Sequence, residues 1–341
     1  DDAFPIADID DILPGLIEGR ERVYYSMGHD SRFDERVMDW VKVIRAKAKL
    51  GAHPPGEFLV LDHLLHELRL IKSKHEIELM QHAAEISAEG HRQAMAVCAP
   101  GVHEYTLVAE LNYAFTRGGS RAPAYNSIVA AGENACILHY DRNDAEVKDG
   151  DLILIDAGCE YQYYASDITR TFPANGTFNP QQKAIYELVL KAQDAAIDAV
   201  QPGAPWDAPH NASVRVITQG LIKLGLIEGT LAKAIKAEAY RDFYMHRVGH
   251  WIGIDVHDVG DYKIDEKWRL LEPGMVTTIE PGIYIAPDNK RVPKKWRGIG
   301  VRIEDDVLVT KKGNRVLTTG IPKTVAEIET FMAQAKQKRA A

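Results

Sequence analysis

Residues 152–171 read LILIDAGCEYQYYASDITRT and place two carboxylates, Asp156 and Asp167, beside the most apolar run of the chain. The run 152–155 has the continuous hydrophobicity of a strand that is buried on both faces. We predict a hairpin in which this strand ends on Asp156, AGCE at 157–160 forms the turn, and residues 161–172 return as a strand containing Asp167. Strands disfavour Asp, and buried like charges need a positive partner. Either Arg170 or a metal ion is therefore expected to neutralise the pair.

The composition is that of a globular protein with one large domain or two. The 341 residues are 45% hydrophobic, and the formal net charge of −8 argues against a nucleic-acid partner, which would need a basic face. No apolar run approaches the roughly 18 residues of a membrane span, so no membrane partner is expected. Three cysteines without a C-x-x-C pair suit reduced thiols and a cytoplasmic location. Since the first residue is not Met, we expect the natural N-terminus and any targeting signal to lie outside this sequence.

A repeat with an offset of about 100 residues organises the chain beyond residue 70. Helical patterns at 74–97 and 180–200 each break at a Pro-Gly pair and are followed by a second helix. Strand-like sequence then holds a histidine, His139 in ILHY and His250 and His257 in HRVGHWIGIDVHD. This repeat predicts an α+β fold of duplicated units, packed about a pseudo-two-fold axis with a site where they meet. Residues 1–60 read as helix, strand and a helix ending on Gly51.

Two later segments also put charge into apolar strand patterns. In MVTTIEPGIYI (275–285), Glu280 directly follows an apolar strand. In GIGVRIEDD (298–306), the alternation places Arg302 and Glu304 on the same face of a strand. Each observation has an ordinary explanation when taken alone, since a strand can be polar on a solvent-facing side and Asp156 can simply cap a turn.

The histidine segment 245–260, MHRVGHWIGIDVHDVG, carries a different signal. A histidine here is often only a hydrogen-bonded core residue, and the segment lacks the H-E-x-x-H zinc motif. Gly249 and Gly253 flank His250, however, and predict a backbone that approaches another group closely, as a metal or substrate site requires.

Five residues taken together predict a pair of divalent cations. Four carboxylates and one imidazole occupy positions where charge is costly, and no comparable number of Lys or Arg residues matches them. Such a cluster suits two cations about 3.5–4 Å apart. The dominance of carboxylates and the lack of Cys ligands favour Mn²⁺, with Co²⁺ or Zn²⁺ as substitutes. The candidate ligands are Asp156, Asp167, His250, Glu280 and Glu304.

At these residues the sequence resembles the dinuclear metallopeptidases of the pita-bread fold, and within them the Xaa-Pro aminopeptidase (aminopeptidase P) family. The resemblance runs from Leu70 onward and rests on ILIDAG, SDITRTFP, HRVGHWIGIDVHD, TIEPG and GVRIEDD in this order, together with NSIVAAGENACILHY. It implies release of the residue that precedes a proline in the second position of a peptide, by a hydroxide that bridges two metals.

The resemblance also implies a role for each residue of the site. Asp156 would be a terminal ligand, Asp167 and Glu304 would bridge the metals, and His250 and Glu280 would bind the second metal. Glu280 would also shuttle the proton to the leaving nitrogen. His139 and His257 would contact the substrate carbonyl and stabilise the tetrahedral intermediate. Tyr284 and Arg302 would support the metal-bound hydroxide, and His246 would bind substrate or support the site.

The same resemblance sets the expected domains and the rival functions. Residues 1–70 would be a partial N-terminal domain and linker, residues 71–341 the catalytic domain, and the protein a homo-oligomer, either a dimer or a tetramer. Prolidase, which cleaves Xaa-Pro dipeptides, shares the fold and ligands. Methionine aminopeptidase shares the metal pattern but usually lacks a preceding domain. A metal-free pita-bread module that binds peptides would require loss of ligands, whereas all five are present.

Overall fold

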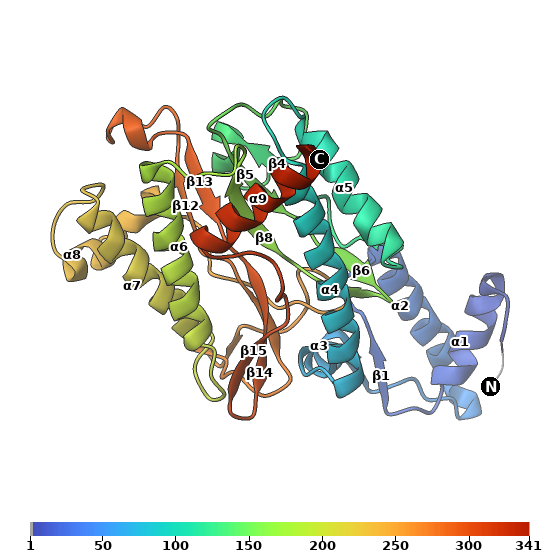
Figure 1. Cartoon of the computed structure of the whole chain (residues 1–341). Coiled ribbons are helices and arrows are strands. Elements are labelled where there is room, and N and C mark those ends of the chain that lie inside the picture. Colours follow the sequence, from blue (N-terminus) through green and yellow to red (C-terminus); the bar gives the residue numbers. More distant parts are fainter. Residues whose placement is uncertain (1–2, 341) are drawn as a thin grey trace. The chain divides into compact units, whose positions relative to one another are not determined.

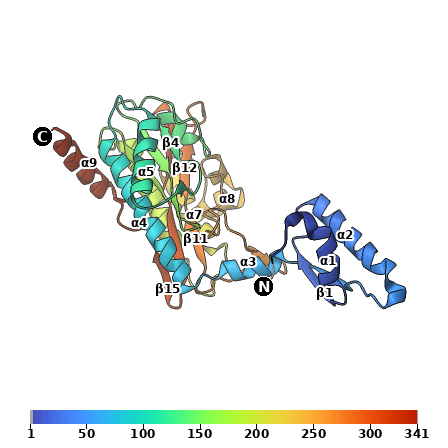
Figure 2. The ribbon, with the colours of Figure 1, turned by 90° about the vertical axis from the view of Figure 1, so that its right-hand side faces the viewer.

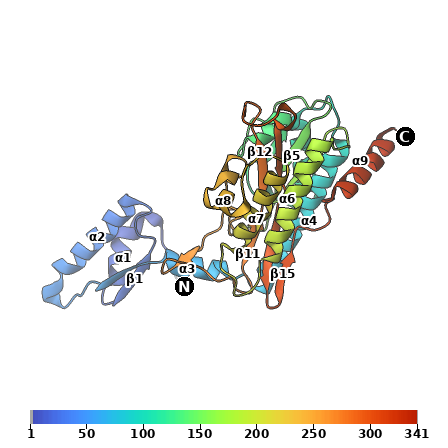
Figure 3. The ribbon, with the colours of Figure 1, turned by 90° about the vertical axis from the view of Figure 1, so that its left-hand side faces the viewer.

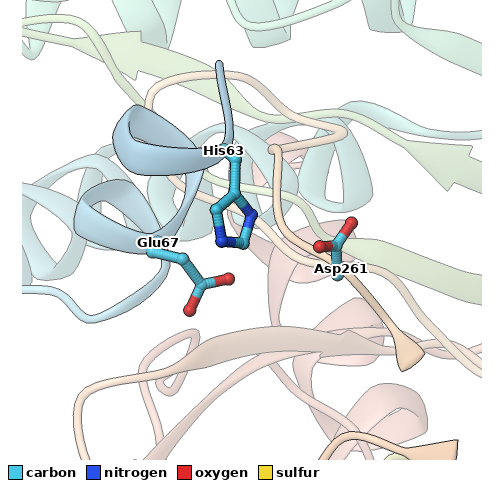
Figure 4. Close-up of side chains that lie close together, drawn as sticks. All are labelled: His63, Glu67 and Asp261. Atoms are coloured by element: carbon cyan, nitrogen blue, oxygen red, sulfur yellow. The ribbon is translucent and has the colours of Figure 1, made fainter. Parts of the chain in front are cut away.

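The computed structural model describes residues 3–340, which divide into one compact unit up to Leu68 and another from Arg69 onward. In the first unit a parallel pair of short strands is flanked by helices (Figure 1). The helix expected to end on Gly51 ends earlier, because a separate 3-10 turn precedes that left-handed glycine. His63 and Glu67 project from the next helix one turn apart (Figure 4). The elements are η1 (Ile6–Asp8), α1 (Ile9–Ile17), β1 (Arg22–Tyr25), α2 (Ser31–Ala46), η2 (Ala48–Leu50), β2 (Glu57–Val60) and α3 (Asp62–Leu70).

Two helix pairs build the flanks of the second unit, in the order that the sequence repeat predicts. In the first pair α4 packs against α5, and in the second pair α6 packs against α7 (Figures 2 and 3). Each pair opens with a capping box, Ser73 with Glu76 and Asn179 with Gln182, which satisfies the free amides of the first turn. The helices are α4 (Lys74–Val97), α5 (Glu104–Arg117), α6 (Pro180–Asp198), α7 (Ala208–Lys223), α8 (Leu231–Lys236) and α9 (Val325–Ala340).

Antiparallel strands lie between the helix pairs. The main sheets have the orders β4-β5-β8 and β11-β14-β15, with β12-β13 as a separate pair. A smaller sheet has the order β3-β6-β7. The strands are β3 (Ala122–Pro123), β4 (Ile128–Ala131), β5 (Leu152–Asp156), β6 (Cys159–Tyr161), β7 (Tyr164–Ala165), β8 (Thr169–Pro173), β9 (Lys263–Ile264), β10 (Lys267–Trp268), β11 (Val276–Ile279), β12 (Gly282–Ile285), β13 (Ile299–Arg302), β14 (Asp305–Thr310) and β15 (Gly313–Val316).

The two halves of the repeat meet at β8 and β13. The Thr171 hydroxyl donates to the Arg302 carbonyl at 2.9 Å, and the Glu304 amide donates to the Thr169 carbonyl at 3.1 Å. Apolar side chains from both halves share one buried core, including those of Phe172 and Val301. This junction brings the ends of β5, β8, β11 and β13 together, and the acids at these strand ends come with them.

The predicted hairpin has a different path in the structure. The AGCE segment is not a turn, because the chain continues from Ala157 and Gly158 into β6. The tight turn lies at Gln162 and Tyr163, whose φ values of 46° and 72° suit a two-residue hairpin between β6 and β7. β5 then pairs with β8 in the register that sets Asp156 opposite Thr169. An additional small hairpin is therefore inserted between the two long strands.

Asp167 was expected within a strand and instead lies in the short link between β7 and β8. Its own amide donates to a carboxylate oxygen of Asp306 at 3.0 Å, and the neighbouring Ile168 carbonyl accepts the Ala157 amide. The backbone at Asp167 is thus held from both sides without a strand ladder. This arrangement removes the conflict between Asp and strand propensity that the sequence presented.

The strand-like histidine segments are also not regular strands. His139 lies in a turn that follows the 3-10 helix η3 (Gly132–Cys136). The stretch around His250 runs beside β11, where the Thr278 amide donates to the His250 carbonyl at 2.9 Å, yet only an isolated bridge at Trp251 is formed. Within residues 3–340, no helix has the length and apolar character needed to cross a bilayer.

A buried histidine on α4 predicts how stability depends on pH. The His91 ring is 1% exposed, and its Nε2 donates to the Ala157 carbonyl at 2.9 Å. Burial outweighs that hydrogen bond and lowers its pKa from 6.5 to about 4. Below about pH 6.5 the unfolded chain binds a proton that the folded chain rejects until about pH 4. This difference removes up to about 3 kcal/mol of stability as the pH falls through that window.

We expect His91→Gln to flatten this dependence. The urea midpoint of unfolding is measured at about pH 7.5 and at about pH 5 in the presence of a chelator. The change in midpoint between these pH values should be smaller for His91→Gln than for the parent protein. His75→Gln changes an exposed histidine of the same helix and should leave the dependence intact. Equal pH dependence in the His91→Gln protein and the parent would count against the linkage.

Candidate metal centre

A cavity of about 680 Å³ opens at the junction of the two halves. It collects the polar groups that the sequence singled out, although they come from segments more than 150 residues apart. Of the predicted site residues, only Tyr284 does not line it. The predicted residues on its wall are His139, Asp156, Asp167, His246, His250, His257, Glu280, Arg302 and Glu304.

The acids and one imidazole form a tight cluster at this cavity. Ligand atoms of Asp167, His250 and Glu304 all lie within 4.8 Å of one another. Nε2 of His250 is 3.5 Å from a carboxylate oxygen of Asp167 and 3.8 Å from one of Glu280. Asp156 joins through the Tyr125 hydroxyl, which is 2.7 Å from Asp156 Oδ1 and 2.5 Å from Asp167 Oδ1.

Arg170 does not neutralise the hairpin acids, so the first of the two alternatives from the sequence is wrong. Its guanidinium pairs with Asp305 at 2.7 Å and donates to the Glu304 carbonyl at 2.6 Å. Arg302 supplies the positive contact instead, with Nη2 2.6 Å from Asp156 Oδ2. Arg302 also donates to the Thr169 hydroxyl at 3.2 Å, so a single arginine is oriented by several partners.

Negative charge remains in excess around the cavity. Burial, followed by repulsion from the other carboxylates, raises the pKa of Glu304 well above its usual range. Burial raises the pKa of Glu280 to about 7, although His250 and Arg302 oppose the rise. Asp156 has its pKa raised by burial as well, against the pull of Arg302. Asp167 and Glu304 are buried, Asp156 and Glu280 are partly buried, and Arg302 is the arginine that contacts this set. Bound cations would stabilise such a group of carboxylates.

The orientation of His250 suits a metal ligand. Its Nδ1 lies 2.9 Å from the Trp251 carbonyl, which can only accept, so Nδ1 carries a proton. Nε2 then faces the acids with a lone pair in the neutral ring, the arrangement that metal-binding histidines commonly adopt. Burial lowers the pKa of His250, but Asp167 and Glu280 outweigh it and raise the value to about 9. A divalent cation at Nε2 would take the place of that proton, so the donor set fits such an ion.

Tyr284 reaches the site through other side chains. Arg302 Nη1 donates to the Tyr284 hydroxyl at 3.0 Å, and this hydroxyl lies 2.9 Å from Nε2 of His246. Nδ1 of His246 donates to the Arg247 carbonyl at 2.7 Å, so Nε2 accepts from the tyrosine. Burial, reinforced by Arg302, lowers the pKa of His246 to about 3. This series of hydrogen bonds holds Arg302 and a neutral His246 in fixed orientations.

Two histidines of the predicted set face the cavity without joining the acidic cluster. The His257 ring stands nearly perpendicular to the His250 ring, with 4.3 Å between their centroids. His139 comes from the opposite half of the repeat and lines the cavity beside Tyr140. Both imidazoles are therefore placed to contact a substrate group that enters the cavity.

Three polar residues that support the acids were missed by sequence reasoning. Tyr125 bridges Asp156 and Asp167, and the Thr169 hydroxyl donates to Glu304 at 2.6 Å. Asp306 accepts the amide of Asp167. Tyr125 stands just before NSIV, and the register that pairs Ile128 with Asp156 explains its nearness. That register could not be read from one strand alone.

The close backbone approach predicted by the glycines is present, with different neighbours. A Cβ on Gly249 would lie 1.9 Å from the Thr278 carbonyl oxygen, so the segment carrying His250 can press against β11. A Cβ on Gly253 would meet the Asp258 carboxylate, which pairs with the buried Lys72 at 3.1 Å. The glycines thus permit backbone and ion-pair packing beside the site.

Comparison with known proteins agrees with this arrangement. Residues 78–311 match the model of Metallopeptidase family M24. A Xaa-Pro aminopeptidase from Escherichia coli is 44% identical over 338 residues, covering 99% of this chain and 76% of the relative. A human Xaa-Pro dipeptidase is 39% identical over 315 residues, covering 82% of this chain and 64% of the relative.

Solved structures give the same result. The structure of the Pseudomonas aeruginosa aminopeptidase PepP aligns with a TM-score of 0.96 and 66% identity, over 98% of this chain and 76% of that one. An Escherichia coli aminopeptidase P variant in complex with substrate aligns with a TM-score of 0.94 and 44% identity, over 99% of this chain and 76% of that one. The expected α+β pita-bread fold is confirmed. From the matched residues and the shared fold, we conclude that this chain belongs to metallopeptidase family M24.

Proposed function

We propose that this protein is a metal-dependent Xaa-Pro aminopeptidase, which removes the first residue from peptides that have proline second. The observation that carries the proposal is the acidic cluster at the cavity, where ligand atoms of Asp167, His250 and Glu304 lie within 4.8 Å. Two relatives that are 44% and 46% identical to this chain, and a solved structure that is 66% identical, are named as aminopeptidases, which supports an aminopeptidase over a prolidase.

We propose that the cluster holds two divalent cations. Asp156 would be a ligand of one, His250 and Glu280 ligands of the other, and Asp167 and Glu304 would be shared. Bound there, the cations would lower the pKa of water toward neutrality and polarise the substrate carbonyl. Because the donors are four carboxylates and an imidazole with no thiolate, we propose Mn²⁺ as the native metal.

The protein's own residues would complete the reaction. His139 and His257 face the cavity, where their N–H groups would donate to the carbonyl oxygen as negative charge develops on it. Glu280 would carry a proton to the proline nitrogen as the amide bond breaks. Arg302 is held by Asp156 and Tyr284, and its positive charge would support the hydroxide that attacks the substrate carbonyl.

Apolar groups on the cavity wall suit a proline ring. Among the lining residues, Ile128, Leu138 and Val256 are aliphatic, and Tyr262 adds an aromatic surface. A pocket of this kind orients a ligand through shape, while a few polar groups fix its reacting atoms. The first residue of the peptide would then lie with its carbonyl at the acidic cluster.

The substrate assignment is tested with three peptides. The Mn²⁺-loaded protein should release the first residue from an Xaa-Pro-Yaa tripeptide and leave both the Xaa-Pro dipeptide and Xaa-Ala-Yaa largely intact. Cleavage of the dipeptide alone would identify a prolidase. Equal cleavage of the alanine and proline tripeptides would remove the proline specificity.

His257→Ala should separate catalysis from metal binding. The imidazole contacts His250 but is not one of the proposed ligands, so the variant should keep its metal content and lose roughly 10²–10³-fold in kcat, as expected for one lost oxyanion donor. Metal analysis and steady-state kinetics on the same samples check this. A variant that lost its metal would assign His257 to the ligand set instead.

Location and assembly form a separate proposal. Cys98, Cys136 and Cys159 are all free thiols, which agrees with the reducing conditions of the cytoplasm. We propose a cytoplasmic homo-oligomer, either a dimer or a tetramer. Light scattering of the purified protein would give its mass, and a mass of about 38 kDa would identify a monomer.

A further inference from the structure

A fully buried carboxylate lies on the far side of the His139 loop. Glu104 is the first residue of α5 and is 0% exposed. Within residues 3–340 the Glu104 carboxylate forms no salt bridge. The amino-terminal end of the helix does favour its negative charge. Burial of an unpaired carboxylate is costly unless hydrogen bonds replace its hydration, so the partners of Glu104 indicate what it is for.

Within residues 3–340, the four donors to the Glu104 carboxylate all come from the segment that contains His139. Oε1 accepts from the Ala131 amide at 2.7 Å and from Asn134 Nδ2 at 3.1 Å. Oε2 accepts from the Tyr140 hydroxyl at 2.8 Å and from the Ala145 amide at 2.9 Å. The carboxylate therefore ties both ends and the middle of the 131–145 loop to the start of α5.

His139 depends on this loop for its position. Among the hydrogen bonds of residues 3–340, none involves the His139 ring, and the side chain lines the cavity. The next residue, Tyr140, is buried and bonded to Glu104. A second tie comes from Asn143, which accepts the Val129 amide and donates to the Ser127 carbonyl, each at 2.8 Å. Backbone anchoring thus replaces a direct partner for the imidazole.

We propose that Glu104 is a positioning residue for the aminopeptidase reaction, holding the 131–145 loop so that His139 faces the scissile carbonyl. This inference rests on the proposed function and on the role given there to His139. Glu104 itself does not touch the cavity, since it is not among its lining residues. Its effect on the reaction passes through His139.

Glu104→Gln is the sharpest single change. Glutamine has the same shape, but its NH₂ group must replace one of the two oxygens. In one orientation of the glutamine the NH₂ group faces the Ala131 amide, and in the other it faces the Ala145 amide. A backbone N–H cannot accept a hydrogen bond, so one of these two contacts is lost in either orientation. One end of the loop is released in either case. Glu133→Gln is the matched control, because Glu133 is an exposed carboxylate of the same loop.

A double-mutant cycle distinguishes positioning from a general loss of structure. The four proteins are the parent, Glu104→Gln, His139→Ala and the double variant, each loaded with Mn²⁺ and assayed on an Xaa-Pro-Yaa tripeptide. We expect Glu104→Gln to lower kcat by about 10- to 100-fold in the parent, with KM and metal content nearly unchanged. In the His139→Ala protein the same change should cost about twofold or less, because the group through which it acts is absent.

Equal losses in both backgrounds, or loss of metal from Glu104→Gln, would overturn the inference while leaving the proposed function standing. An inactive parent protein would instead contradict the proposed function, and the inference with it. If Glu104→Gln does not fold, Asn134→Ala removes one donor and keeps the carboxylate. Its smaller loss in kcat should likewise disappear in the His139→Ala background, and an undiminished loss there would contradict the inference.

Discussion

Asp167→Ala is expected to abolish metal binding and peptide hydrolysis together. Asp167 is the only acid in contact with both the Tyr125 hydroxyl and the His250 ring within residues 3–340, and its own amide is fixed by Asp306. The Asp167 carboxylate is proposed to bind both cations, and its negative charge would offset their mutual repulsion. Without this carboxylate the two cations would repel each other at short range. We expect kcat/KM to fall by at least about 10³-fold, which corresponds to about 4 kcal/mol.

The measurement is metal content per chain together with tripeptide hydrolysis on the same sample. Asp288→Ala is the control, because it removes an exposed aspartate from a loop outside the cavity. Its metal content and rate should equal those of the parent. Near-normal turnover by the Asp167→Ala protein would refute the dinuclear assignment, whereas loss of rate with full metal content would reduce Asp167 to a substrate contact.

Gly158→Ala is expected to damage the site without changing any polar group. A Cβ at Gly158 would stand 1.8 Å from the Ser166 carbonyl oxygen and 3.2 Å from the Asp167 amide nitrogen. Since the obstructing atoms are backbone, the link between β7 and β8 must move, and Asp167 with it. Overpacking of this kind typically costs about 1–3 kcal/mol and occasionally more.

We expect Gly158→Ala to lower both the thermal midpoint and the metal affinity. Melting curves with and without Mn²⁺ would show a smaller stabilisation by the metal than in the parent, because the folded state binds it less tightly. Gly15→Ala is the control, since a Cβ there meets nothing within 4 Å and alanine suits a helix better than glycine. An unchanged response to Mn²⁺ in Gly158→Ala would show that Asp167 tolerates the displacement.

The residues gathered at the cavity could be named from sequence because local patterns mark each one. Charge at the end of an apolar strand is costly wherever that strand packs, so Asp156, Glu280 and Glu304 stand out before any contact is known. Their roles as metal ligands stay predictions. The family signature also predicted the fold, which the comparisons confirm.

Pairings between distant segments could not be read in the same way. Arg170 is close to Asp167 in sequence, yet its side chain pairs with Asp305, and Arg302 reaches Asp156 across the junction of β8 and β13. Tyr125 escaped notice because its contact with Asp156 depends on the register of β4 against β5. The inserted turn at Gln162 and Tyr163 was hidden by residues that seldom adopt positive φ. The contacts of Arg170, Arg302 and Tyr125 were thus decided by tertiary packing and register, which one strand does not encode.

Titration of the metal-free protein with Mn²⁺ tests the central claim most directly. Protein stripped by a chelator is assayed on an Xaa-Pro-Yaa tripeptide while bound metal is measured at each addition. The acidic cluster predicts no hydrolysis without metal, and activity that rises until about two equivalents are bound. Full hydrolysis by metal-free protein would contradict the account, and so would failure to bind Mn²⁺ at all, which would identify a peptide-binding module on the same fold.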